Sequence, residues 1–256
     1  MPRTRGRKPL LPSRHPLLIL RARIAMTALD AILDRPTPTL RWGRATLKLE
    51  TLRPTGGTDD RAVALLTGPG VLEATAGAAL AAAAWMRARK FALVIRPRGV
   101  FTHEVRETLR LWGVRLDPAA EPTLPPLDGP GAAAIFARTL GAEIADASLV
   151  VAAGGARAAL LGALDRGARG IALYAATPAD ELPELPVLAG LGELPAQVER
   201  LAVTRAQASA ARTLLCRELG LLAGHACAVA AVVAAERGAV ALLTSAGERE
   251  FSLDPR

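Results

Sequence analysis

Short apolar runs of strand length alternate with longer runs of helical periodicity along most of the chain. Residues 91–95 (FALVI) and 147–153 (ASLVVAA) are continuous apolar runs typical of buried strands. Residues 102–112 place apolar side chains at helical spacing behind Thr102, a residue type that favours a helix N-cap. This alternation predicts an α/β fold with parallel sheets covered by helices on both faces. The same reasoning predicts strands at residues 45–50, 114–116, 170–175 and 239–243, and helices at residues 71–89, 132–143, 156–166, 204–219 and 225–237.

Two segments between these runs are predicted to be irregular. Residues 117–130 contain five prolines, which is too many for a regular helix or strand. Residues 178–195 are rich in proline and glycine and are predicted to be mostly loop. Because parallel sheets bind ligands at the carboxyl ends of their strands, we expect site residues in the loops that follow strands.

The net charge of +8 is concentrated at one end of the chain. Residues 1–25 hold seven basic residues and no acidic one, which leaves a net charge of +1 for the remainder. A charge block of this kind is typical of a disordered basic tail. The nearly neutral remainder offers no positive stripe for a phosphate backbone, so nucleic-acid binding is expected only through the tail. Met26 follows the tail and is a candidate for the true start.

The residue types that build metal centres and disulfide frameworks are scarce. Cys216 and Cys227 are the two cysteines, so we expect a reducing, cytoplasmic setting and no zinc site. His103 and Glu104 resemble the start of a zinc-protease helix, but Glu107 stands where the second histidine would be. No apolar run reaches membrane-spanning length without charge. We therefore expect no metal and no membrane contact.

Six segments, in order along the chain, carry a resemblance to a known family. They are residues 31–40 (AILDRPTPTL), 47–61 (LKLETLRPTGGTDDR), 73–77 (EATAG), 150–156 (VVAAGGA), 218–224 (ELGLLAG) and 245–249 (SAGER). Together they resemble the cysteine synthase-like enzymes, which use pyridoxal phosphate and have the tryptophan synthase β-like fold, also called fold type II. The chain is similar to a shortened, degenerate member of that family.

The resemblance implies two α/β lobes with parallel three-layer sheets and the cofactor between them. The large lobe would comprise residues 26–66 and 118–256, and a small mobile lobe would comprise residues 67–117. The family's lysine forms an imine with pyridoxal phosphate and moves the substrate's α-proton. The matching position here is Asp59, and a carboxylate cannot form an imine. Lys48 matches a different family position, Lys8 lies in the tail and Lys90 precedes a strand of the small lobe, so none is expected to replace it.

Other expected ligand contacts survive only in part. The serine and asparagine of the substrate loop are replaced by Ala76 and Ala78, and the serine facing the cofactor's pyridine nitrogen is replaced by Ala246. The hydroxyls of the phosphate loop are lost, while its glycines could still bind an anion through backbone N–H groups. Arg157 is a new cation beside that loop. The resemblance thus implies a degenerate ligand pocket made of Thr75, Gly77, Gly154, Gly155, Arg157 and Ser245.

Three functions remain open on this basis. The favoured hypothesis is a catalytically inactive homologue without cofactor, a partner or regulator that forms a homodimer or pairs with an active paralogue. The second is an active lyase or sulfur transferase that uses pyridoxal phosphate after all. The third is a small-anion-binding protein that uses Gly154, Gly155 and Arg157.

Overall fold

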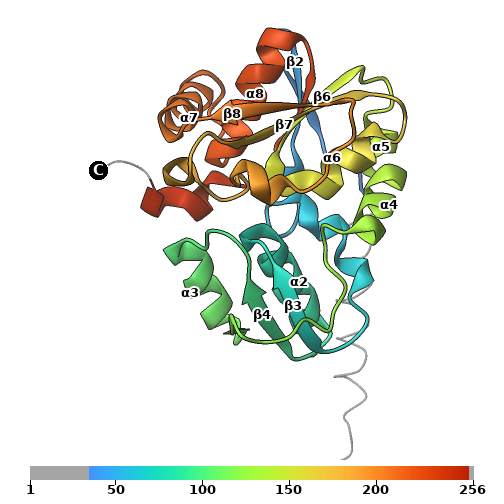
Figure 1. Cartoon of the computed structure of the whole chain (residues 1–256), viewed down its shortest axis with the longest axis vertical. Helices are drawn as coiled ribbons and strands as arrows, with labels where there is room; N and C mark the ends of the chain where they lie inside the picture. The colour runs from blue at the N-terminus through green and yellow to red at the C-terminus, as the bar shows by residue number, and fades with distance from the viewer. Residues whose placement is uncertain (1–34, 254–256) are drawn as a thin grey trace, which may run out of the picture.

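The computed structural model describes residues 35–253, and its strands form two separate sheets (Figure 1). The predicted basic tail and the candidate start at Met26 lie outside the described residues. The larger sheet has six strands in the order β1-β2-β9-β6-β7-β8, and the smaller one has the order β3-β4-β5. The strands are β1 Thr39–Trp42, β2 Ala45–Lys48, β3 Gly70–Ala74, β4 Leu93–Pro97, β5 Arg115–Leu116, β6 Leu149–Ala153, β7 Arg169–Ala175, β8 Val198–Val203 and β9 Val240–Leu242.

Helices cover both faces of the six-stranded sheet, as the predicted α/β fold requires. All its neighbouring strands pair in parallel except β1 and β2, which pair antiparallel. Val150 faces one apolar cluster with α4, α5 and α6, while the next residue, Val151, faces the other with α7 and α8. These helices are α4 Pro130–Arg138, α5 Leu140–Glu143, α6 Arg157–Leu164, α7 Arg205–Leu219 and α8 His225–Arg237.

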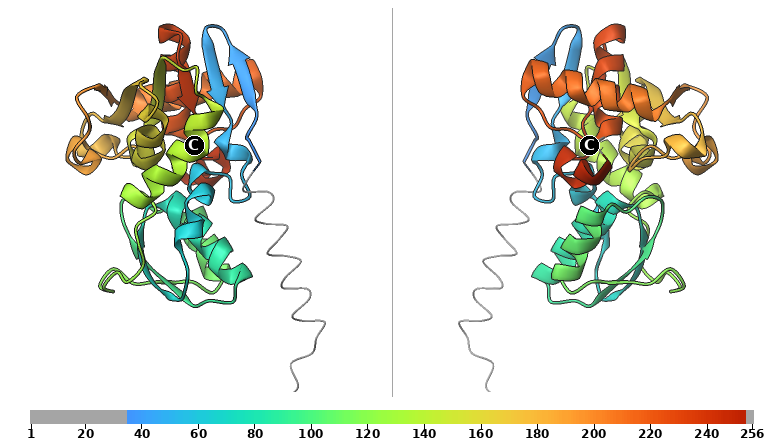
Figure 2. Two further views of the ribbon diagram at one scale, coloured as in Figure 1. Left: turned by 90° about the vertical axis from the view of Figure 1, so that its right-hand side faces the viewer. Right: turned by 90° about the vertical axis from the view of Figure 1, so that its left-hand side faces the viewer.

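The three-stranded sheet and its two helices form the second, smaller lobe, seen from two sides in Figure 2. The predicted helix at residues 71–89 is wrong at its start, because residues 70–74 form β3 and α2 covers Ala76–Ala88. Alternating burial along β3 and its parallel pairing with β4 outweigh the helical preference of the alanine-rich stretch. Helix α3 covers His103–Leu111, and the Thr102 side chain accepts a hydrogen bond from the Val105 N–H, as predicted.

Three further elements differ from the prediction. Strands β1 and β8 are the two edges of the large sheet, and most of their side chains are exposed or half-buried, so neither shows a buried-strand pattern. The predicted helix at residues 132–143 is broken at Thr139, which separates α4 from α5. Short 3-10 helices occupy several connections, namely Glu50–Leu52, Thr58–Arg61, Val63–Leu65, Gly154–Ala156, Pro178–Asp180, Leu188–Leu191 and Gly247–Leu253.

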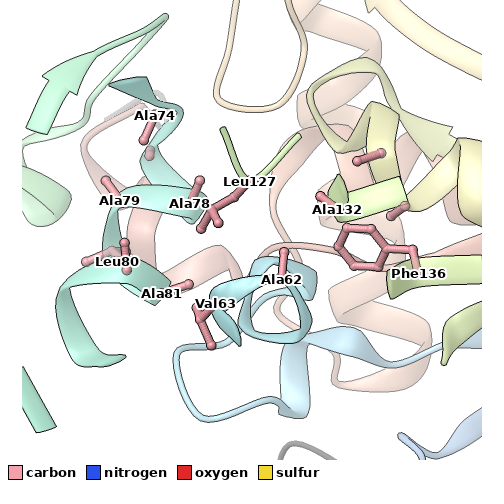
Figure 3. Close-up of a cluster of buried hydrophobic side chains, with 14 of the residues drawn as sticks. Ala62, Val63, Ala74, Ala78, Ala79, Leu80, Ala81, Leu127, Ala132 and Phe136 are labelled. Atoms are coloured by element: carbon pink, nitrogen blue, oxygen red, sulfur yellow. The ribbon is translucent and has the colours of Figure 1, made fainter. Parts of the chain in front are cut away.

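One apolar cluster runs without interruption from the small lobe into the large lobe (Figure 3). Ala78 on α2 and Ala132 and Phe136 on α4 belong to it, and Leu127 from the proline-rich link lies between these helices. The link also runs along β3, where Thr123 and Leu124 donate backbone hydrogen bonds to Val71. The two lobes are therefore joined by packed side chains and not only by the chain connections.

A buried network of charged side chains fixes the base of the large lobe. Arg61 donates to Glu50 and to Glu143, each at 2.7 Å, and Lys48 donates to Glu143 and to the carbonyl of Thr37. Burial alone would raise the pKa of Glu143, but hydrogen bonds from Arg61 and Lys48 outweigh it and lower that pKa. These bonds hold the Lys48 side chain in the core.

Candidate functional site

A cavity of about 300 Å³ lies between the two lobes. It is lined by loops that follow three strands: Thr75 after β3, Arg98 after β4, and Gly154 and Gly155 after β6. The segment 181–192 closes the remaining side. The cavity therefore lies at the carboxyl ends of the strands, where an α/β sheet is expected to bind ligands. Of the predicted pocket residues, Thr75, Gly154, Gly155 and Arg157 line it.

The space beside the glycine loop after β6 is occupied by residues 184–191 of the protein itself. The Gly155 N–H donates to the carbonyl oxygen of Glu184 at 2.8 Å. A Cβ atom at Gly155 would lie 2.6 Å from the Glu184 Cα, and one at Gly154 would lie 2.2 Å from a methyl of Leu191. Both glycines thus allow residues 184–191 to pack against the loop, and the Gly155 N–H is not available to an anion in this arrangement.

Arg157 begins helix α6 beside the glycine loop. Its guanidinium donates to the carbonyl oxygen of Glu193 at 2.6 Å, which ties it to the segment that closes the cavity. Its Nε is buried and has no hydrogen-bond partner within residues 35–253. Arg157 thus borders the cavity, but one of its nitrogen atoms is hydrogen-bonded to the protein's own backbone.

Asp59 points towards the start of helix α2. A Cβ atom at Gly77 would lie 2.6 Å from the Asp59 Oδ2 and 3.5 Å from the Glu184 Oε1. The two carboxylates therefore face the same point beside Gly77. Desolvation by burial, followed by the charge of Glu184, raises the pKa of Asp59 to about 8. Gly77 does not line the larger cavity but leaves room for the Asp59 side chain.

Glu184 is the site residue that sequence reasoning missed. Leu182 and Leu185 exchange backbone hydrogen bonds around Pro183 and Glu184, and Glu184 has φ 60°, a conformation that favours glycine. Its carboxylate accepts a hydrogen bond from the Thr244 hydroxyl. Burial raises the pKa of Glu184. No motif marks this residue, because the turn that presents it follows from packing against Gly155.

Ser245 does not reach the cavity. It is buried, and its backbone N–H lies 3.3 Å from the Cys227 Sγ. The Cys227 Sγ also lies 3.3 Å from the Thr244 Oγ1. Burial, followed by the charge of Glu184, raises the pKa of Cys227 to about 12, so this thiol is not a nucleophile at neutral pH. Ala246, at the position implied to face a pyridine nitrogen, is buried as well.

The lysines and acidic groups near the cavity define the chemistry available. Lys48 belongs to the buried charge network, and Lys90 lies on the surface after α2, so neither of these lysines lines the cavity. No group of three or more histidine, cysteine or acidic side chains is arranged to hold a metal ion in the described part of the chain. No helix between residues 35 and 253 is both long and apolar enough to cross a membrane.

The fold occurs in several solved enzyme structures. O-ureido-L-serine synthase superposes with a TM-score of 0.65 at 22% identity, over 88% of this chain and 92% of that chain. O-acetylserine-dependent cystathionine β-synthase from Helicobacter pylori gives 0.66 at 19% identity, over 88% and 96%. Cysteine synthase from Entamoeba histolytica gives 0.68 at 15% identity, over 99% and 94%. The chain has the cysteine synthase fold.

This agreement confirms the predicted tryptophan synthase β-like architecture with parallel sheets. No protein-family model and no curated protein sequence matches the chain. The low identities mean that the likeness extends to the cysteine synthase fold alone. What this chain does with the fold must therefore be argued from the residues at its own cavity.

The residues at the cavity do not fit pyridoxal phosphate. Asp59 presents a carboxylate where the resemblance implies an amine, and the space directly beside it measures about 10 Å³, the size of one water molecule. The Gly155 N–H is donated to Glu184, and the Glu184 carboxylate adds a second acid at the site. An anionic cofactor would meet two carboxyl groups and no amine. The two guanidinium groups at the cavity, those of Arg98 and Arg157, are already bonded to Asp128 and to the Glu193 carbonyl.

Proposed function

We propose that this protein is a non-catalytic member of the cysteine synthase fold that works by binding and does not use pyridoxal phosphate. The observation that carries the proposal is the position of Asp59, whose carboxylate faces Gly77 together with that of Glu184. Covalent chemistry on the cofactor starts from a lysine amine, and no lysine within residues 35–253 lines the cavity.

Electrostatics at the site support the same conclusion. Raised pKa values for Asp59 and Glu184 mean that the cleft already disfavours negative charge. A phosphate group would add negative charge beside these acids, and the backbone N–H of Gly155 that could offset it is already donated to Glu184. The third hypothesis, binding of a small anion by Gly154, Gly155 and Arg157, loses the Gly155 N–H for the same reason. It would depend on the Arg157 guanidinium, which already donates to the Glu193 carbonyl.

The test is to mix the purified full chain with pyridoxal phosphate and record the visible absorption band of an internal aldimine. We expect no band, whereas cysteine synthase from Entamoeba histolytica serves as the positive comparator. A Lys90→Arg variant is the matched control, because Lys90 is exposed and would react non-specifically. The proposal is wrong if a stoichiometric band survives gel filtration in both chains and borohydride traps it on one lysine.

A partner or regulator role for such a protein stays a prediction. Mass photometry of the chain alone and mixed with an active paralogue would test it. A defined heteromer would support pairing through the fold, and a monomer in every mixture would count against it.

A further inference from the structure

A second, very small cavity lies next to the Asp59 carboxylate. It measures about 10 Å³ and is lined by acidic side chains at Asp59, Asp128 and Glu184, with Thr58 and Gly155 beside them. Asp128, Gly155 and Glu184 also line the 300 Å³ cavity, so the two spaces adjoin. The remaining lining is apolar and comes from Leu127, Phe136 and three alanines at residues 156, 158 and 159. Together the two spaces form a narrow end, acidic on one side and apolar on the other, that continues into a wider chamber.

The Thr58 hydroxyl lines this narrow end and has hydrogen-bonding capacity that the described residues do not use. Thr58 is 3% exposed, and its Oγ1 has no hydrogen-bond partner in the part of the chain that the structure describes. A buried hydroxyl left without a partner costs about 1–3 kcal/mol, so folded proteins normally satisfy it with protein, water or ligand. A group that binds here would donate to Thr58 and to the carboxylates.

We propose that this narrow end binds the primary ammonium group of a small organic cation whose body lies in the larger cavity. The inference rests on the proposed function, because the ammonium would occupy space that an amine-bound cofactor would otherwise need. An ammonium group carries three N–H donors, and Thr58 Oγ1, Asp59 and Glu184 supply three acceptors.

Size favours this ligand class. A space of about 10 Å³ holds one water-sized group, and an –NH₃⁺ head is that small, whereas a guanidinium or a trimethylammonium head is larger. The larger cavity of about 300 Å³ has room for a short aliphatic chain attached to the head. A metal ion is a poorer match, since no cluster of three ligating side chains forms within residues 35–253.

Charge favours it as well. Burial raises the pKa of Asp59 most, followed by the charges of Glu184, Asp60 and Asp128, and Arg249 is the cation that opposes them. Burial also raises the pKa of Glu184, although its carboxylate accepts hydrogen bonds from Thr244 and Cys227. Arg98 forms an ion pair with Asp128 and so leaves Asp59 and Glu184 as the acids to be neutralised. A bound cation would do this, and ammonium binding should strengthen as these acids ionise with rising pH.

Isothermal titration calorimetry of the full chain at about pH 8.5 tests the proposal, with n-butylammonium chloride as the probe. At that pH the probe remains charged, because an alkylammonium resembles lysine with a pKa of about 10.4. n-Butanol has the same chain without charge, and n-butyltrimethylammonium has the charge without N–H donors. We expect measurable binding of n-butylammonium and binding at least about tenfold weaker for both analogues, the factor that one lost hydrogen bond to a charged group supplies.

Variants then assign the binding to this place. Asp59→Asn and Thr58→Val keep the shape of each side chain and remove an acceptor, and each should weaken n-butylammonium binding by about tenfold or more. Asp165→Asn removes an exposed acid after α6 and should leave it unchanged. Glu184→Gln is a second reporter if a variant unfolds, and circular dichroism checks folding in each case.

Three results would overturn the inference: equal affinity for n-butylammonium and n-butanol, unchanged affinity in Asp59→Asn and Glu184→Gln, or no binding at all. These are distinguishable from a failure of the proposed function. An internal aldimine with pyridoxal phosphate refutes the proposed function, while absence of both aldimine and ammonium binding refutes the ammonium site alone.

Discussion

Asp59→Asn should stabilise the protein at alkaline pH, although it alters a side chain in the candidate site. The substitution keeps the size of the side chain and replaces one carboxylate oxygen with an amide. Asp59 faces Glu184 beside Gly77, and burial followed by that neighbouring charge raises its pKa from 3.8 to about 8. The folded protein therefore resists ionising a group that ionises freely in the unfolded chain.

The magnitude follows from the two pKa values. A tenfold change in an ionisation constant corresponds to about 1.4 kcal/mol, so moving from 3.8 to about 8 sets an upper limit of about 6 kcal/mol. Asp59 is half-buried, and water that reaches it screens part of this cost. We expect Asp59→Asn to gain about 2–3 kcal/mol relative to the wild-type chain at pH 9.

The size of this stabilisation depends on pH. Between pH 4 and 8 the folded chain holds a proton on Asp59 that the unfolded chain has released. Stability from this group is therefore fully present below about pH 4 and is lost as pH rises through about 8. The asparagine variant cannot ionise, so its advantage over the wild-type chain is small at pH 5 and largest at pH 9.

Urea unfolding at pH 5 and pH 9 measures this advantage as a difference in the free energy of unfolding. Asp165→Asn provides the control, because that acid is exposed and should show no such pH dependence. If the advantage of Asp59→Asn is the same at both pH values, Asp59 ionises normally in the folded protein. The mutual influence of Asp59 and Glu184 would then be refuted, and with it the electrostatic reason for excluding an anionic cofactor.

Two substitutions test the scaffold that positions the site. Lys48→Met leaves Glu143 without one of its buried cations. It should lower the free energy of urea unfolding by about 3–5 kcal/mol. The control Lys90→Met, on the surface, should change that free energy by less than about 0.5 kcal/mol. Thr204→Ala removes the capping box of α7 and should cost about 1 kcal/mol, and an effect no larger than that of Thr213→Ala within α7 would contradict the cap's role.

Local signals in the sequence predict much of the fold. The continuous apolar runs at residues 91–95 and 147–153 become β4 and β6. Strand β6 is buried on both faces, whereas β4 has one buried and one half-buried face that happens to carry apolar residues. Residues 204–219 become α7 behind a threonine cap, and Gly220 ends it in the left-handed conformation. The sequence does not show where β3 ends and α2 begins, because the alanine-rich stretch favours a helix. Residues 70–74 form a strand because they pair with β4.

The site residues that directly follow strands could be predicted from the sequence. Those on the loop of residues 181–192, which folds back onto the site, could not. Thr75, Gly154 and Gly155 follow β3 and β6, so their meeting at one cavity follows from the topology. Glu184 reaches the same place through a turn whose geometry is fixed by contact with Gly155, and that contact is between residues far apart in the sequence. Ser245 was expected in the pocket but lies buried against Cys227 instead.

Retained glycines at the cleft do not by themselves indicate a retained ligand. The resemblance assigns Gly77 and Gly155 to ligand-binding loops, yet each has a steric reason within this chain. A side chain at Gly77 would collide with the Asp59 carboxylate, and one at Gly155 would collide with the backbone of Glu184. The two residues that make these glycines necessary are the same two acids that make the cleft unsuited to an anion. These positions therefore need small residues because the protein's own acids occupy the space, and that arrangement is the one on which the proposed ammonium site rests.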